Sequence, residues 1–113
     1  MNWKEINKKH PKAFDLFFKW FKGDPKATMK KQEFLDINDI VVMHGSLREL
    51  YDFFDELEIF VHCYNTEISK WYWEIDEYGA ECLKDYETRQ ISEEVAFLKA
   101  FEILENEIKI NKT

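Results

Sequence analysis

The stretch from Ser46 to Ile75 constrains the fold most, because it joins one amphipathic helix directly to two strands. In its first part, SLRELYDFFDEL, apolar and charged side chains separate onto opposite sides at about 100° per residue, as in a helix. Ser46 and Glu49 have the spacing of a capping box, in which a hydroxyl and a carboxylate satisfy free backbone N–H groups. The predicted apolar side comprises Leu47, Leu50, Tyr51, Phe53, Phe54 and Leu57.

Two segments with alternating side chains follow this helix, EIFVHCYN (58–65) and SKWYWEI (69–75). A period of two in β-branched and aromatic residues predicts strands. Only a short turn near Asn65 and Thr66 separates them, so they are expected to pair as an antiparallel hairpin.

The number of residues in that turn decides which side chains share a face of the hairpin. An even loop would place His62 on the side of Trp73, whereas an odd loop would place Val61 there. We favour the odd loop, because it gathers the aliphatic strand residues with the tryptophans. The opposite face is then covered by a second helix or is a binding surface. This candidate interaction face consists of Phe60, His62, Tyr64 and Tyr72.

Helices are predicted on both sides of this stretch. Lys12–Lys22 is amphipathic, and Pro11 suits the first turn of a helix, where its missing N–H costs nothing. Within Lys26–Gly45, KATMKKQEF is typical of a basic helix, and NDIVVMHG contains a short β-branched run typical of a strand. The last helix is expected to run from Ser92, as N-cap, to Ile108. The fold class is therefore α+β: helices packed on an antiparallel β-hairpin or three-stranded meander, with a long C-terminal helix.

Length and charge narrow the class of protein further. The 113 residues fit a single domain, 1–113, and carry a net charge of −7. The charge is uneven: residues 1–45 hold nine Lys against six Asp or Glu, and residues 46–113 hold seven basic against seventeen acidic residues. Cys63 and Cys82 are too few for a disulfide framework, and neither a signal peptide nor a membrane span is evident. We expect a cytoplasmic protein without membrane contact.

The sequence shows no catalytic constellation. Ser46 is accounted for as a helix cap, and Cys63 lies at a strand position expected to be buried. Asp52, Asp55 and Glu56 lie opposite the apolar side of their helix, in water, where they gain no acid–base power. The three His lack metal-ligand spacing, and no Gly-rich phosphate loop is present. We therefore expect neither an enzyme nor a bound cofactor or metal.

Lysines crowd the first third of the chain, with Trp3 and Trp20 among them. Basic residues with interleaved aromatics can grip a phosphate backbone and stack bases. The acidic body would repel a polyanion, however, and both tryptophans fit buried helix faces, so nucleic acid is not the expected partner. A nucleic-acid-associated module using the Lys-rich N-terminal helix is the alternative function. Its candidate basic patch consists of Lys8, Lys9, Lys12 and Lys19.

The segments Leu50–Glu56 (LYDFFDE) and Ala96–Glu105 (AFLKAFEILE) resemble small uncharacterised proteins found with phage and prophage genes in Bacteroides-type bacteria. Those proteins pair an LYDFFDE helix and following strands with a closing helix. The resemblance covers roughly the second half of the chain and implies an intracellular accessory protein of a mobile element. We expect a non-enzymatic, acidic protein that binds another protein, or itself as a homodimer, through an aromatic surface.

Overall fold

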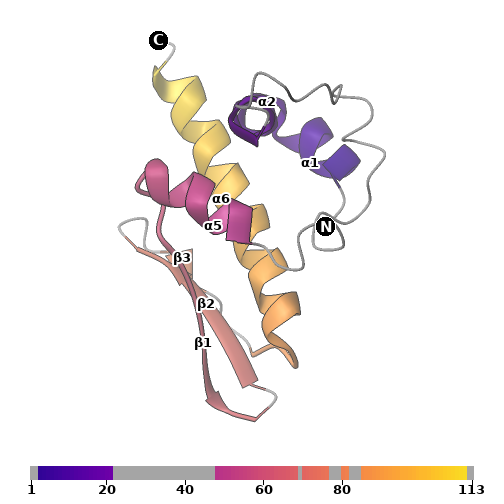
Figure 1. Cartoon of the computed structure of the whole chain (residues 1–113), viewed down its shortest axis with the longest axis vertical. Coiled ribbons are helices and arrows are strands. Elements are labelled where there is room, and N and C mark those ends of the chain that lie inside the picture. The colour runs from indigo at the N-terminus through magenta and orange to yellow at the C-terminus, as the bar shows by residue number, and fades with distance from the viewer. Residues whose placement is uncertain (1–2, 22–47, 69, 77–79, 82–84, 112–113) are drawn as a thin grey trace. The chain divides into compact units, whose positions relative to one another are not determined.

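The computed structural model (Figure 1) describes residues 3–21, 48–68, 70–76, 80–81 and 85–111, and these form an α+β fold as expected. With the labels of Figure 1, the elements are α1 (Trp3–Lys9), α2 (Pro11–Phe21), α5 (Arg48–Glu56), β1 (Val61–Glu67), β2 (Lys70–Ile75), β3 (Ala80–Glu81) and α6 (Arg89–Asn111). The predictions for Ser46, Leu47 and Lys26–Gly45 lie outside the described residues. Within the described ranges, no helix combines the length and apolarity that crossing a membrane requires.

Contacts group the chain into two compact units, so the expectation of a single domain stays a prediction. Unit 1 comprises Met1–Glu49 and Phe101–Thr113, and unit 2 comprises Leu50–Ala100. The long helix α6 contributes residues to both.

Aromatic rings form the core of unit 1. Trp3 of α1 is 1% exposed and stacks on Phe17 of α2, with ring centroids 5.5 Å apart. Both rings meet Phe101 of α6 edge-on, at 6.3 Å and 5.9 Å. Aromatic pairs in these geometries contribute about 0.5–1.5 kcal/mol each beyond the area they bury. The three rings therefore hold together segments that lie far apart in the sequence.

A carboxylate from α6 caps the start of α2. Pro11 occupies the first helical position, as predicted, and the carbonyl of His10 accepts a hydrogen bond from Phe14 N–H at 2.9 Å. The free N–H of Ala13 donates to Oε1 of Glu105 at 2.8 Å, and Glu105 is 1% exposed. The positive end of a helix favours such an anion. Glu105, near the other end of the chain, thus caps the N-terminus of α2 as an N-cap side chain would.

The amphipathic character predicted for α5 is confirmed. Leu50, Phe53 and Phe54 are buried, whereas Asp52 and the remaining carboxylates of its last turn are exposed. In unit 2 the ring of Phe54 stacks on Phe97 of α6 at 5.9 Å, and Tyr51 meets the same ring edge-on at 4.8 Å. These contacts make Phe97 the centre of the packing between α5 and α6.

Helix α5 ends in a Schellman motif. Ile59 N–H donates to the carbonyl of Phe54 at 2.9 Å, and Glu58 N–H donates to that of Asp55 at 3.0 Å. The motif requires a left-handed residue, and here it is Glu58, with φ of 60°. Buried Ile59 then leads the chain directly into β1.

The sheet has the order β1-β2-β3, with β3 adding only two residues to the β1–β2 hairpin. Between β1 and β2, odd-numbered residues pair with odd-numbered residues: Val61 with Ile75, and Cys63 with Trp73. Five residues separate the paired Asn65 and Trp71, and the register shifts between Asn65 and Glu67. The assignment of side chains to the two faces is confirmed, but the register shift produces it rather than an odd loop, because Glu67 pairs with Lys70 and only two residues lie between them. The turn expected near Asn65 and Thr66 is wrong, since both residues lie within β1.

Helix α6 begins at Arg89 rather than at Ser92, and Thr88 caps it. Thr88 Oγ1 accepts a hydrogen bond from Ile91 N–H, and its carbonyl accepts one from Ser92 N–H, both at 3.2 Å. The prediction of Ser92 as N-cap is wrong, because that side chain is fully buried within the helix and donates its hydroxyl to Cys63.

Replacing Glu58 with Gly should stabilise the protein. A left-handed conformation costs a non-glycine residue about 1–2 kcal/mol, and part of the gain is lost to the greater freedom of Gly in the unfolded chain. We expect Glu58→Gly to raise the free energy of unfolding by about 1 kcal/mol in urea titrations. Glu58→Gln removes the same charge without relieving the backbone, so a similar gain in that variant would contradict this account.

Replacing Glu105 with Ala should destabilise the protein, because it leaves the buried N–H of Ala13 without an acceptor. An unsatisfied buried donor costs about 1–3 kcal/mol. Thermal or urea unfolding should show a loss in that range. Glu102→Ala removes an exposed carboxylate from the same helix. If both variants lose equally little stability, Glu105 does not act as the cap of α2.

Candidate interaction surface

The outer face of the hairpin carries the four residues predicted as an interaction face. Val61, Trp73 and Ile75 are buried on the inner side. Because side chains alternate along a strand, residues of even number point to the other side. His62 and Tyr64 are exposed there, whereas Phe60 and Tyr72 are half-buried. We call these four residues the outer aromatic face.

A stacked tyrosine pair forms the middle of the outer aromatic face. Tyr64 and Tyr72 are direct partners across the two strands, with ring centroids 5.7 Å apart and planes inclined by 26°. Tyr64 is 44% exposed. Cross-strand aromatic pairs stabilise a sheet by about 0.2–1 kcal/mol, and the stacking orders both rings. The pair therefore offers a flat, ordered surface with polar hydroxyl ends.

His62 and Asp76 form a polar contact beside the tyrosines. His62 Nε2 lies 2.8 Å from Asp76 Oδ2, and both side chains are about half exposed. Across the strands, His62 pairs with Glu74, and Glu74 pairs with Glu81 of β3. These carboxylates share the outer side of the sheet, so the tyrosine pair is bordered by negative charge.

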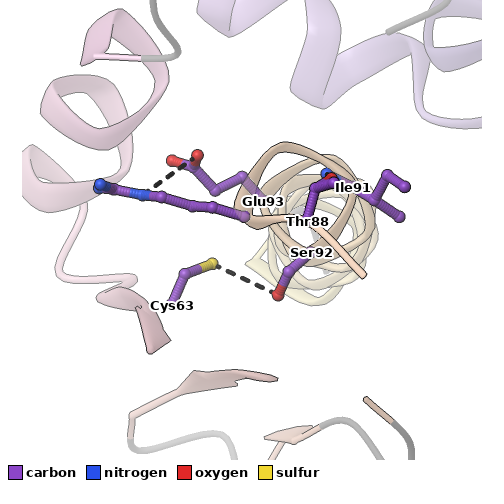
Figure 2. Close-up of polar contacts among 6 residues, drawn as sticks. Cys63, Thr88, Ile91, Ser92 and Glu93 are labelled. Atoms are coloured by element: carbon purple, nitrogen blue, oxygen red, sulfur yellow. Dashed lines mark hydrogen bonds and ion pairs between the residues drawn. The ribbon is translucent and has the colours of Figure 1, made fainter. Parts of the chain in front are cut away.

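The inner side of β1 carries a polar cluster around Cys63. Ser92 Oγ donates a hydrogen bond to Cys63 Sγ at 3.8 Å, and Figure 2 shows the Ser92 side chain directed from α6 toward Cys63. Next to Ser92, the Glu93 carboxylate lies 3.4 Å from the Arg89 guanidinium. The Tyr51 hydroxyl also forms hydrogen bonds with Glu93 and Cys63. The cluster joins α5, β1 and α6 within unit 2.

The environment of this cluster suppresses acid–base and nucleophilic chemistry. Burial raises the pKa of the Cys63 thiol above its ordinary value, and the hydroxyls of Tyr51 and Ser92 only partly oppose this effect. Burial, reinforced by hydrogen bonding to Glu93, raises the pKa of Tyr51 well above its usual range. Since the nucleophile is the thiolate, a thiol held protonated is poorly reactive. Among the described residues, no three His, Cys, Asp or Glu side chains gather to hold a metal ion.

The four lysines of the predicted basic patch are all exposed on α1 and α2. Lys9 Nζ lies 2.9 Å from Glu5 Oε1, and this contact lowers the pKa of the Glu5 carboxyl. Trp3 is buried in the unit 1 core and half-buried Trp20 stacks on Phe17, so Trp3 has no free face for a base. The alternative function needs aromatic side chains, placed among the basic residues, on which nucleotide bases can stack. Trp3 is not available for this role.

Comparisons with protein-family models, with curated proteins and with solved structures find no match to this chain.

Cys63 should react slowly with alkylating reagents in the folded protein. Its raised pKa reduces the thiolate fraction near neutral pH, and its partial burial restricts access. In a Cys82→Ser variant, iodoacetamide labelling followed by mass spectrometry should be slower at pH 7.5 than for the same variant in denaturant. Labelling at equal rates in the folded and unfolded states would show that the thiol is neither buried nor held protonated.

Proposed function

We propose that this chain is a non-enzymatic accessory protein of phage or mobile-element origin that acts by binding protein through its outer aromatic face. The observation that carries the proposal is the Tyr64–Tyr72 stack on the solvent side of the hairpin. The same two strands bury their aliphatic and tryptophan side chains on the inner side. Exposed Tyr64 and half-buried Tyr72 are therefore not needed to complete the inner core.

The arrangement has the physical properties of a binding surface. Tyrosine supplies a large contact area and loses little conformational freedom on binding, because it has few rotatable bonds. The stacking of Tyr64 on Tyr72 orders both rings before a partner arrives, which lowers the entropy cost of association. An aromatic centre bordered by polar side chains such as His62, Glu74 and Asp76 matches the anatomy of protein interfaces.

The described residues offer little support for catalysis. The thiol of Cys63 and the phenol of Tyr51 are held protonated, and Ser92 is fully buried with its hydroxyl directed at sulfur. A nucleophile needs an activating base and access to substrate. The cluster is better explained as the polar link between helices and sheet, which favours an interaction role.

The phage-related origin rests on the resemblance of Leu50–Glu56 and Ala96–Glu105. Phe54 and Phe97, which lie in these two segments, stack on each other in the core of unit 2. The resemblance therefore concerns residues that build the fold. The outer aromatic face lies outside both segments.

The proposal is tested by comparing partner recovery between matched surface variants. Purified tagged protein is used as bait in host lysate, and bound proteins are quantified by mass spectrometry. We expect a specific partner, or the chain itself, to bind the wild type and to be lost, by about tenfold or more, from Tyr64→Ser/Tyr72→Ser. Removing a hot-spot aromatic costs ≥2 kcal/mol in typical interfaces, and about 1.4 kcal/mol is tenfold.

Asp52→Ser/Asp55→Ser is the matched control, because both carboxylates are exposed and belong to α5 rather than to the hairpin. Circular dichroism checks that each variant is folded. Equal recovery by the tyrosine and control variants would contradict the role of the outer aromatic face. A chain that is strictly monomeric and retains no partner would contradict the interaction function itself.

A further inference from the structure

Among the described residues, strand β1 of the sheet pairs along one edge only, and its other edge is called the open edge. In the order β1-β2-β3, β1 pairs with β2 on one side only, and no strand in the described part of the chain pairs with its other side. An edge strand presents a row of main-chain donors and acceptors that another strand can pair with. Proteins commonly protect such edges with Lys, Pro or a β-bulge. VHCYNTE of β1 contains neither Lys nor Pro, and its register shift lies near its end, between Asn65 and Glu67.

The ladder shows which groups face the open edge. Asp76 N–H donates to the carbonyl of Phe60 at 3.1 Å, so these residues form a hydrogen-bonded pair. Because such pairs alternate in an antiparallel ladder, His62 and Tyr64 also direct their N–H and C=O groups toward β2. The groups that point to the open edge belong to Val61, Cys63 and Asn65.

We propose that β1 is a dimerisation strand, on which β1 of a second copy of this chain pairs antiparallel. The inference rests on the proposed function and names its partner. Two sheets would then join into one continuous sheet across a two-fold axis. Each copy would contribute the same strand, as expected for a closed symmetric dimer.

The tyrosines favour a register in which the axis passes beside Tyr64. Tyr64 of one copy then faces Tyr64 of the other across a non-hydrogen-bonded pair, where side chains approach most closely. Cys63 pairs with Asn65 of the second copy, and both use the main-chain groups that point to the open edge. The stack of Tyr64 on Tyr72 continues into a ladder of tyrosines across both copies, which gives each added ring an aromatic neighbour.

The charges of β1 favour a second copy as its partner. The strand carries one carboxylate, Glu67, at its end, and His62, which already contacts Asp76. The regular part of β1 before the register shift, Val61–Asn65, carries no carboxylate, so no two like charges oppose each other where the two copies pair. Like charges directly opposite would destabilise it. The remaining repulsion between two copies of charge −7 acts over longer distances and is screened by salt.

The experiment measures the mass of the full chain by light scattering and sedimentation over a range of concentrations in about 0.15 M salt, where the Debye length is about 8 Å. We expect the mass to rise with concentration from 13.8 kDa to about twice that value. Asn65→Pro removes an edge-facing N–H without removing a donor of the β1–β2 ladder, a position at which edge strands tolerate Pro. It should raise the dimer dissociation constant by about tenfold or more, and Asn65→Ala, which keeps the N–H, should not.

If Asn65→Pro does not fold, a second variant tests whether β1 forms the dimer. Tyr64→Arg places two cations across the proposed axis and should dissociate the dimer, whereas Tyr72→Arg, one strand further from it, should do so much less. A chain that stays monomeric, or a dimer that neither Asn65→Pro nor Tyr64→Arg weakens, would overturn the inference. If the chain is monomeric but Tyr64→Ser/Tyr72→Ser loses a different protein, self-pairing fails while the interaction function stands.

Discussion

The register of the β1–β2 hairpin, in which Val61 pairs with Ile75 and Tyr64 with Tyr72, determines which side chains lie on each of its faces. With Cys63 opposite Trp73, the side chains of Val61, Trp73 and Ile75 enter the core of unit 2, and those of His62 and Tyr64 face outward. A slip of one residue would bury His62 and expose Val61, which would lose apolar burial and leave an imidazole to be satisfied. The free-energy cost of burying His62 in place of Val61 therefore keeps Tyr64 on the solvent side with Tyr72.

The same register explains why Cys63, the one cysteine among the described residues, faces the packed side of the hairpin. Its inward position places the Cys63 thiol beside the Tyr51 and Ser92 hydroxyls in a low-dielectric setting, which keeps it protonated. Outward, Tyr64 keeps its ring ordered by stacking but remains accessible. The hairpin thus divides into a side whose polar groups bind one another and a side whose groups are available to a partner.

Local patterns in the sequence predicted most of what the structure shows, and non-local contacts account for the errors. The amphipathic α5 and Pro11 at the start of α2 follow from local patterns. The faces of the hairpin were predicted by gathering its aliphatic residues with the tryptophans, but a β-bulge rather than an odd turn produces this arrangement. The N-cap of α6 was misassigned because Thr88 and Ser92 are both good capping residues, and only the contact of Ser92 with Cys63 decides between them. Nothing near Glu105 in the sequence signals that it caps a helix whose first turn lies at the opposite end of the chain. Four candidate residues of the outer aromatic face were identified, but the open edge of β1 requires the strand order, which the sequence does not contain.

The most direct test of the account is the register of the hairpin in solution. In an antiparallel ladder, the α-hydrogens of a non-hydrogen-bonded pair lie close enough for a strong nuclear Overhauser effect. NMR should therefore show strong contacts between the α-hydrogens of Cys63 and Trp73 and between those of Val61 and Ile75. Strong contacts between the α-hydrogens of His62 and Trp73 instead would place Tyr64 on the side of Trp73, away from Tyr72, and would contradict the account.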